Sequence, residues 1–363
     1  MRVCPRPMRT IDDLKQIKKI DRSGMLVRAA ALPAQCLEGW SIGLRWKVPA
    51  AYAKTKQLLV LGMGGSAIGA DLVQGILGDD LPKPTVVSRG YTIPKWVGPE
   101  TLVLVASYSG NTEETLSSAM AASKKGGKII AITSGGKLAD WCRSKRYPLT
   151  LIPQGLPPRS AVGYMTFIPL GLMVRLGWVS RASVPVEKAC REAERFVKNS
   201  LGPKSKTVRN PAKQIALRLH GKIPELYGAA GGWEGIVYRW RTQIEENAKA
   251  LAFHHMIPEA THNEVSAWMN PKPLMPKMAA VFLTDRDLHP RTRRRMQFTA
   301  GVVKKEKAAA LFVEAPGSSR LARMIGLIAI GDFVSSYLGI LYGIDPTPVE
   351  RIEGLKKFMI KGG

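Results

Sequence analysis

Short apolar runs alternate with amphipathic, helix-like segments through most of this 363-residue chain. Such alternation predicts βαβ units, in which parallel strands are joined by helices that cover the sheet. In the first half, each apolar run has the length of a buried strand and is bounded by turn residues. The predicted strands of this half are 57–62, 85–88, 101–107, 128–134 and 147–153.

The same rhythm returns after residue 202, without a clear sequence repeat. Strands are predicted at 222–231, 278–285 and 310–317, with a long helix over 235–253 and a basic helix over 291–307. We therefore predict an α/β fold with two mostly parallel sheets flanked by helices. The predicted division is an N-terminal domain with a leading helical segment, a Pro/Gly-rich connection with helices, and a C-terminal domain, over residues 1–153, 154–201 and 202–363.

The chain is strongly basic. Lysine and arginine number 54 against 28 aspartates and glutamates, so the formal net charge is +26 at pH 7. Such a charge favours anionic partners, which include phosphorylated substrates, nucleic acids and membrane surfaces. However, the basic residues are spread along the chain, and the densest cluster is RTRRR at 291–295. Because no nucleic-acid-binding module is recognisable, we predict a basic surface rather than specific nucleic-acid binding.

Cysteine usage and one apolar segment bear on location. The four cysteines, at positions 4, 36, 142 and 190, form no CxxC pair, which predicts reduced thiols in a cytoplasmic protein. The N-terminal residues lack the apolar core and cleavage site of a signal peptide. Residues 324–344 are mostly apolar but include Asp332 and several glycines. We expect a helix buried in a domain core there, rather than a membrane span.

Two loops that follow predicted strands carry the residue types of a phosphate site. GMGGSAIG, residues 62–69, is a glycine-rich turn, and SYSGNTEET, residues 107–115, has five hydroxyl side chains and no basic residue. Both turns lie at the carboxyl ends of parallel strands, so Ser66 is expected to approach the hydroxyls of the second loop. Hydroxyls, backbone N–H groups and a helix dipole can together hold a phosphate monoester without a lysine.

Each loop also has a purely structural interpretation. Ser109, Asn111 and Thr112 are residues that cap helices, and a glycine turn often serves only the chain path. The first loop lacks both the acidic residue of a dinucleotide fingerprint and the Gly-Lys-Ser/Thr of a nucleotide P-loop. The two loops together favour a phosphate cradle over either structural role.

These loops also carry a family resemblance. The chain resembles the sugar isomerase (SIS) domain, and more closely the bifunctional phosphoglucose/phosphomannose isomerases of the phosphoglucose isomerase superfamily. The resemblance implies two SIS domains and a cytoplasmic, dimeric, cofactor-independent enzyme. Its reaction would interconvert glucose 6-phosphate or mannose 6-phosphate with fructose 6-phosphate. Further motifs in the family's order are PPRSAVGY at 157–164, EENAKALAF at 245–253, EATHNEVSAW at 259–268 and DPTPVERIEGLKKF at 345–358.

The resemblance implies a role for each matched residue. Arg159 would stabilise negative charge near the reacting carbons, and Glu246 would move the proton between carbons 1 and 2. His262, supplied across the subunit interface, and Lys356 would assist opening of the sugar ring, with the adjacent Lys357 as the alternative lysine. The residues that would hold the sugar phosphate are Gly65, Ser66, Ser107, Ser109 and Thr112.

The residue types suit this chemistry. Isomerisation through a cis-enediolate needs one carboxylate that reaches both carbons, and Glu246 is such a group. Its neighbour Glu245 would point about 100° away around a helix, so we expect it to face solvent. Histidine titrates near neutral pH, as ring opening requires, and arginine keeps its charge beside an enediolate.

We expect neither a metal nor a cofactor. The candidate zinc ligands would be His254, His255, His262 and Glu264, but the sequence has no HExxH motif or other compact ligand pair. Without the resemblance, Arg159 would be interpreted as an exposed residue after two prolines, and His262 as a loop or capping residue.

Two other functions stay open. In the first, the chain is an isomerase of a different phosphosugar, such as an amino-sugar phosphate. In the second, it is a phosphosugar-sensing regulator without catalysis. Such regulators usually carry a helix-turn-helix domain first, and the first predicted strand here already begins at Gln57. The presence of Glu246, Arg159 and His262 favours catalysis.

Overall fold

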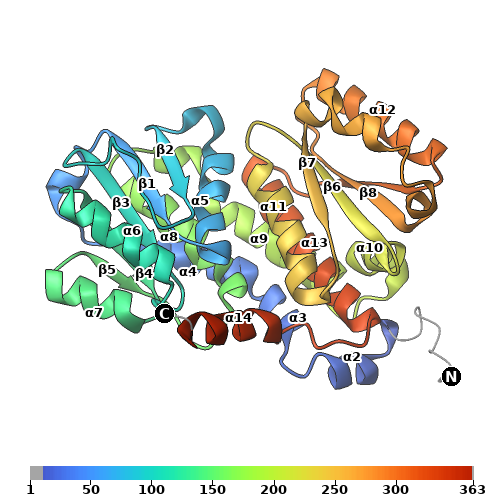
Figure 1. The fold of residues 1–363 in the computed structure, drawn as a ribbon, viewed down its shortest axis with the longest axis horizontal. Coiled ribbons are helices and arrows are strands. Elements are labelled where there is room, and N and C mark those ends of the chain that lie inside the picture. Colours follow the sequence, from blue (N-terminus) through green and yellow to red (C-terminus); the bar gives the residue numbers. More distant parts are fainter. Residues whose placement is uncertain (1–10, 362–363) are drawn as a thin grey trace.

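Two α/β units lie side by side in the computed structural model, which describes residues 11–361 (Figure 1). The first unit holds a parallel sheet in the order β2-β1-β3-β4-β5. Its strands lie within the predicted ones because each apolar run is bounded by turn residues. They are β1 (Gln57–Leu61), β2 (Thr85–Ser88), β3 (Thr101–Ala106), β4 (Lys128–Thr133) and β5 (Leu149–Leu151).

Helices follow three of these strands. Every residue of β3 is buried, as expected for a central strand that is covered on both faces. The next helix begins with Glu113 and Glu114 in its first turn and has Lys124 in its last, which matches the charge preference of a helix dipole. The helices are α5 (Gly64–Leu77), α6 (Glu113–Lys124) and α7 (Gly136–Lys145).

The second unit holds a four-stranded parallel sheet in the order β7-β6-β8-β9. The strands are β6 (Ile223–Ala229), β7 (Phe253–Ile257), β8 (Met278–Thr284) and β9 (Ala309–Glu314). The helices that accompany them are α10 (Pro211–Leu219), α11 (Glu234–Gln243), α12 (Pro290–Lys305) and α13 (Arg320–Leu341). Both halves of the chain therefore have the α/β architecture predicted for them.

The prediction of one long helix over 235–253 is wrong. Helix α11 ends at Gln243 and continues as a π-helical turn, η7 (Ile244–Ala248), before Lys249 takes a left-handed conformation with φ of 53°. The segment FHHMI then forms β7, which pairs with the open edge of β6. Neither glycine nor proline marks the helix end, so the local pattern gave no sign of it.

The leading and connecting helices join the two units. Helix α4 packs closely on α8, because a Cβ at Gly43 would lie only 2.3 Å from the carbonyl oxygen of Ile168. Helix α9 contacts both α4 and α13. The division at residues 153 and 201 stays a prediction. These helices are α2 (Leu14–Ile20), α3 (Met25–Ala30), α4 (Leu32–Arg45), α8 (Val162–Arg175) and α9 (Val186–Phe196).

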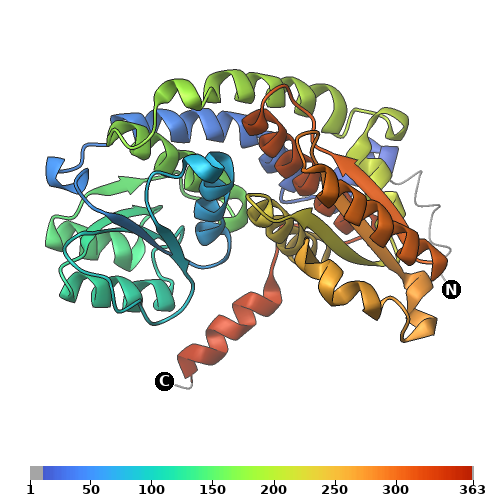
Figure 2. The same ribbon diagram turned by 90° about the horizontal axis from the view of Figure 1, so that it is seen from above.

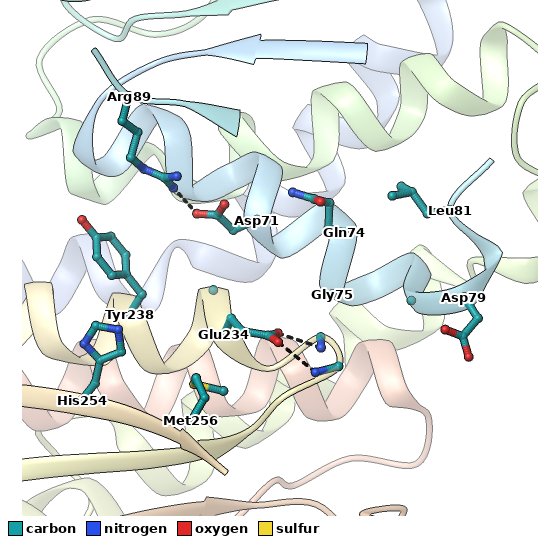
Figure 3. A pocket seen from close by; sticks show the side chains of 14 residues that line it. Asp71, Gln74, Gly75, Asp79, Leu81, Arg89, Glu234, Tyr238, His254 and Met256 are labelled. Carbon is teal, nitrogen blue, oxygen red and sulfur yellow. Dashed lines mark hydrogen bonds and ion pairs between the residues drawn. The ribbon is translucent and has the colours of Figure 1, made fainter. Parts of the chain in front are cut away.

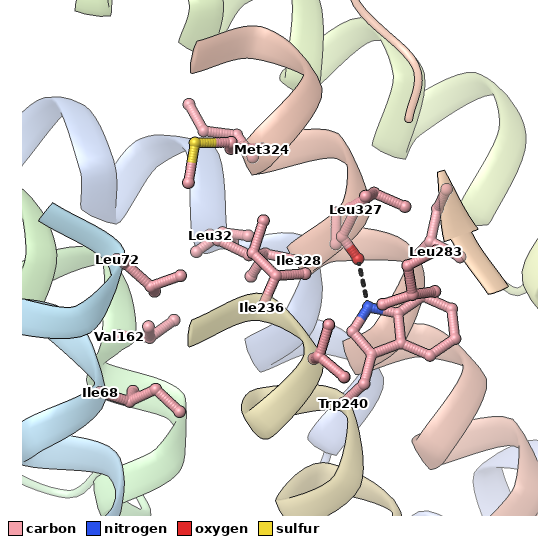
Figure 4. Packing of buried hydrophobic residues seen from close by; sticks show 14 of the residues in the cluster. Leu32, Ile68, Leu72, Val162, Ile236, Trp240, Leu283, Met324, Leu327 and Ile328 are labelled. Atoms are coloured by element: carbon pink, nitrogen blue, oxygen red, sulfur yellow. Dashed lines mark hydrogen bonds between the residues drawn. The ribbon is translucent and has the colours of Figure 1, made fainter. Parts of the chain in front are cut away.

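Apolar packing is continuous between the units. Figure 4 shows Ile68 and Leu72 of α5 facing Ile236 of α11, and these three side chains belong to one buried cluster. Beside them, the indole N–H of Trp240 donates to the carbonyl oxygen of Leu327 at 2.9 Å. The shared core fixes α11, and therefore Glu246 beyond its end, relative to the first sheet.

Helix α13 contains the apolar segment noted in the sequence. By length and composition it is the one helix among residues 11–361 that could cross a membrane, and 94% of its most apolar window is buried inside the fold. Its Asp332 is buried and forms a bidentate ion pair with Arg239, with N···O distances of 3.0 and 2.8 Å. The segment is a core helix, as predicted.

Short helical turns lie between the longer elements along the chain, and the last helix is α14 (Glu350–Lys361). Helix α14 stands clear of both units in Figure 2, and its residues 350–359 are all exposed. The turns are η1 (Ala50–Tyr52), η2 (Gly78–Asp80), η3 (Pro158–Ala161), η4 (Arg181–Ser183), η5 (Val197–Leu201), η6 (Thr207–Arg209), η8 (Glu259–His262), η9 (Glu264–Ala267) and η10 (Lys272–Lys277).

Strand β6 carries a buried acid, Glu225, which is 7% exposed. Burial, and then the negative charge of Glu264, raises the pKa of Glu225 from 4.5 to about 8. Between these pH values the folded state holds a proton that the unfolded state has released. The free energy of unfolding therefore falls as the pH rises from 4.5 to about 8 and stays low above it.

Replacing Glu225 by Gln is expected to remove this loss of stability. At pH 9 the variant should exceed wild type by roughly 3–5 kcal/mol, whereas near pH 4 the two should be similar. Thermal unfolding between pH 4 and 9 measures the difference. Glu194→Gln, at an exposed position of α9, is the control. An unchanged decline of stability with pH in Glu225→Gln would contradict the prediction.

Candidate active site

The two hydroxyl-bearing loops meet at the carboxyl edge of the first sheet. Ser66, in the first turn of α5, accepts a hydrogen bond at Oγ from the backbone N–H of Tyr108 at 3.0 Å. In the second loop, the hydroxyls of Ser107 and Thr112 lie 3.0 Å apart. Ser109 accepts from the N–H of Asn111 at 3.2 Å. The predicted approach of Ser66 to the second loop is therefore present.

The helix-capping interpretation of the second loop does not hold for α6. Thr112 occupies the N-cap position, but its side chain makes no capping hydrogen bond, and α5 has no side-chain cap either. Asn111 instead accepts from the N–H of Lys137, in the first turn of α7. Two helix N-termini without side-chain caps thus lie beside the hydroxyls, and such ends attract anions.

Gly65 sets the distance between this loop and the next motif. A Cβ at Gly65 would lie 3.0 Å from both the Cα of Arg159 and the carbonyl oxygen of Pro158. Any side chain would push the turn η3 away from α5. The absence of a side chain therefore brings Arg159 next to the N-terminus of α5.

Arg159 extends from η3 into the second unit and is 3% exposed. Its Nε donates to Oδ1 of Asn247 at 2.7 Å, and Nη1 donates to Oε2 of Glu246 at 3.1 Å. Its Nη2 donates to the carbonyl oxygens of Pro346 and Thr347 at 2.9 and 2.8 Å. Burial lowers the pKa of the guanidinium, the charge of Glu246 opposes this, and arginine stays charged. These bonds use four of its five N–H groups.

Glu246 is presented by the π-helical turn that follows α11. Its side chain is 28% exposed, so its carboxylate contacts both the buried arginine and solvent. Glu245 instead pairs with Arg241 at 3.5 Å, and its side chain is 35% exposed. The two neighbouring acids therefore point to different surroundings, as expected from helical geometry. Only Glu246 lies beside Arg159.

A second buried arginine holds this arrangement from behind. Arg239, on α11, pairs with Asp332 and also donates from Nη2 to the carbonyl oxygen of Arg159 at 3.0 Å. Gln243 adds a further bond to Asp332 at 2.9 Å. The ion pair of Arg239 with Asp332 is buried and bidentate, so Arg239 has a fixed position. Its bond to the carbonyl oxygen of Arg159 therefore holds the backbone of η3 against α11 and α13.

Lys249 is a cation near the site that sequence reasoning missed. Its Nζ donates to the carbonyl oxygens of Glu246 and Pro346 at 2.6 and 2.9 Å. Burial, and then the charge of Arg159, lowers the pKa of this lysine. The available signal was its place in the matched motif EENAKALAF, three residues after Glu246.

The structure does not bring the predicted ring-opening residues to the Arg159–Glu246 pair. His262 is exposed on η8, and Lys356 and Lys357 are exposed on α14. Among residues 11–361, no hydrogen bond or ion pair joins any of them to Arg159 or Glu246. Yet the segment before α14 is tied to Arg159 through Pro346 and Thr347.

A separate cavity of about 640 Å³ lies along the seam between α5 and α11. Figure 3 shows Arg89 paired with Asp71 on one side, and Tyr238 with His254 on the other. The carboxylate of Glu234 accepts hydrogen bonds from the backbone N–H groups of Gly231 and Gly232. None of the predicted site residues lines this cavity, so it is distinct from the Arg159–Glu246 site.

Comparison with known proteins places the chain in a family. Residues 51–154 match the SIS domain, and residues 208–359 match the bacterial phospho-glucose isomerase C-terminal SIS domain. A bifunctional phosphoglucose/phosphomannose isomerase of Caldicellulosiruptor bescii is 39% identical over 326 residues, which cover 90% of this chain and 96% of the relative. The chain belongs to the bifunctional phosphoglucose/phosphomannose isomerase family. It therefore has the two SIS domains that its motifs imply.

A relative with another named activity and a solved structure of low sequence identity also match this chain. A D-glucosamine-6-phosphate 4-epimerase of Sulfolobus acidocaldarius is 34% identical over 215 residues, covering 59% of this chain and 64% of the relative. Among solved structures, a hypothetical protein of Thermus thermophilus superposes with a TM-score of 0.75 at 14% identity, covering 96% of this chain and 93% of that one. At that identity the likeness shows a shared fold.

Proposed function

We propose that this chain interconverts aldose and ketose hexose 6-phosphates, taking fructose 6-phosphate to glucose 6-phosphate and to mannose 6-phosphate. Membership of the bifunctional family supports the substrate class. The observation that carries the mechanism is the contact of Glu246 with Arg159 at 3.1 Å, beside the hydroxyl loops. The contact supports the proposal because it would bring the base, the fixed cation and the phosphate-binding loops to one place.

The phosphate would bind where α5 and α6 begin. Their N–H groups and the hydroxyls of Ser66, Ser107, Ser109 and Thr112 would hold it, with Gly65 admitting the backbone of η3. This arrangement suits a phosphate because hydroxyls and helix N-termini supply donors without adding a competing side-chain charge.

Proton transfer would follow ring opening. Glu246 removes the proton from carbon 2 of the aldose, and the electrons move toward the carbonyl oxygen to give a cis-enediolate. The remaining N–H of Arg159 and its charge stabilise the oxygen anion. The hydroxyl proton on the oxygen of carbon 2 passes to the oxygen of carbon 1, and protonated Glu246 returns its proton to carbon 1, which leaves a carbonyl at carbon 2 and gives the ketose. Glucose and mannose differ only at carbon 2, so dual specificity requires protonation of either face there. Every step uses side chains of the protein, and none requires a metal or cofactor.

The direct test is a pair of coupled assays on EDTA-treated enzyme with fructose 6-phosphate as substrate. Formation of both glucose 6-phosphate and mannose 6-phosphate is the expected result. Glucose 6-phosphate alone would remove the dual specificity but keep the mechanism. Binding without turnover would favour the phosphosugar sensor. The 4-epimerase among the relatives gives one reason to include glucosamine 6-phosphate as an alternative substrate.

We further infer that the chain acts as a homodimer in which the partner's His262 completes each site. Two observations support this. His262 is exposed and forms no hydrogen bond or ion pair with Arg159 or Glu246 of its own chain within residues 11–361. In addition, the exposed face of α14 carries Ile352, Leu355 and Met359, at helical spacing, with Phe358 beside them. This apolar face is uncovered in the single chain, and Lys356 lies at its edge.

Replacing Leu355 by Glu is expected to weaken the dimer and lower activity together. Leu355 is 59% exposed in the single chain, so the fold itself should tolerate the change. Light scattering after size exclusion, with isomerase assays on the same fractions, measures both. Val208→Glu is the matched control, because Val208 is 79% exposed but lies away from α14 on η6. A fully active monomeric variant would contradict the dimer.

The proposed location is the cytoplasm. The three cysteines that lie within the described residues, Cys36, Cys142 and Cys190, are buried free thiols, which is typical of a reducing compartment. Nucleic acid is not proposed as a partner despite the net charge of +26.

A further inference from the structure

The segment that carries His262 has little regular structure of its own. It follows β7 and consists of the single turns η8 and η9. Isolated turns of this kind are held mainly by tertiary contacts. Two side-chain bonds fix it on either side of His262. Arg295, on α12, donates to Oγ1 of Thr261 at 2.6 Å, and Tyr227, on β6, donates to Oε1 of Glu264 at 2.5 Å.

Tyr227 is a rigid anchor for this segment. It is fully buried, and its ring stacks on Phe282 of β8 with centroids 4.8 Å apart. Its hydroxyl also accepts from the indole N–H of Trp268 at 2.9 Å. Glu264 begins η9 and Trp268 directly follows it, so both ends of this turn meet at one phenol on β6 of the second sheet. His262 lies two residues before Glu264.

The surroundings make the bond to Glu264 sensitive to charge. Oε2 of Glu264 and Oε1 of Glu225 are buried and have no hydrogen-bond partner among residues 11–361. Glu225 lies two residues before Tyr227 on the same face of β6, and Nε2 of His255 is 3.7 Å from its carboxylate. Burial, and then the negative charge of Glu264, raises the pKa of Glu225 to about 8, which favours the neutral form of this acid beside Tyr227 near neutral pH.

We propose that Tyr227 and Glu264 are positioning residues for His262. They hold the turn that presents this imidazole, through a buried phenol–carboxylate hydrogen bond that the indole of Trp268 reinforces. Neither residue need touch the sugar. This inference rests on the proposed isomerase function and adds to it the device by which one chain holds its histidine ready for the neighbouring site.

A double-mutant cycle tests the inference. Tyr227→Phe keeps the ring and its stacking but removes the hydroxyl. In the wild-type background we expect kcat to fall roughly ten- to hundredfold with little change in KM, because small misplacements of a catalytic group have effects of this size. In the His262→Ala background, Tyr227→Phe should cost almost nothing further, because both changes disable the same group. Ring opening, followed by NMR exchange between the anomers of fructose 6-phosphate, should slow in parallel.

Matched variants separate positioning from general damage. Tyr164→Phe removes a phenol–carboxylate bond of the same length, from Tyr164 to Glu38 at 2.5 Å, between α8 and α4, and should leave ring opening unchanged. Glu264→Gln is the second variant if Tyr227→Phe fails to fold, and it should show the same dependence on His262. Equal losses of kcat in the wild-type and His262→Ala backgrounds, or no loss in either, would overturn the positioning role of Tyr227 and Glu264. Such results would leave the proposed isomerase function standing. A wild-type enzyme without turnover would overturn the proposed function and the inference with it.

Discussion

Glu246→Gln is expected to lower kcat for both products by about 10³-fold, with KM nearly unchanged. The amide still accepts a hydrogen bond from Arg159, so the buried guanidinium keeps a partner and the fold is retained. What disappears is the group that carries the proton, and general base catalysis contributes about 10²–10⁴-fold. Coupled assays give kcat and KM, and exchange of the carbon-bound proton in D₂O reports the proton transfer directly.

Glu245→Gln is the matched control for this variant. Glu245 is the adjacent acid, but it pairs with Arg241 and not with Arg159. Its replacement should leave both kcat and the exchange rate close to wild type. If Glu245→Gln lost activity and Glu246→Gln retained it, the base would be misassigned. Loss of isomerase activity in both variants would point to a shared electrostatic effect.

Arg159→Lys is expected to lower both turnover and stability. Lysine keeps the charge but cannot supply the forked donors that serve Asn247, Pro346 and Thr347 at once. Loss of a fixed donor for developing negative charge costs about 10²–10³-fold in kcat. Acceptors left unpaired in a buried site should lower the free energy of unfolding by on the order of 2–4 kcal/mol. Steady-state kinetics and thermal unfolding on one preparation measure both effects.

Arg241→Lys provides the comparison for Arg159. Arg241 also pairs with a glutamate, but its side chain is 25% exposed and its partner is Glu245. Such a partly exposed pair contributes about 0–1 kcal/mol, so this variant should behave nearly as wild type. An Arg159→Lys protein with reduced stability but full turnover would show that Arg159 is structural only.

Local patterns predicted most of the fold and part of the site. The strands of the first sheet stand out because short apolar runs end at turn residues, and parallel strands then place Ser66 beside the loop of Tyr108 by topology alone. The predicted separation of Glu245 and Glu246 follows from the angle between neighbouring helical residues. Strand β7 could not be predicted in this way. FHHMI has no strong strand pattern, and it becomes a strand because β6 offers it an open edge.

The two α/β halves, the phosphate-type loops and, through the motifs, the family could all be predicted from the amino-acid sequence. The role of Arg159 depends instead on tertiary packing, because its partners Glu246, Asn247 and Thr347 lie far along the chain and belong to the other unit. Tertiary packing also sets the hydrogen bond from Tyr227 to the segment that carries His262, and leaves His262 and α14 exposed in a single chain. Helix and strand patterns arise from neighbours a few residues apart, whereas these contacts arise from how distant elements pack, which no local periodicity encodes.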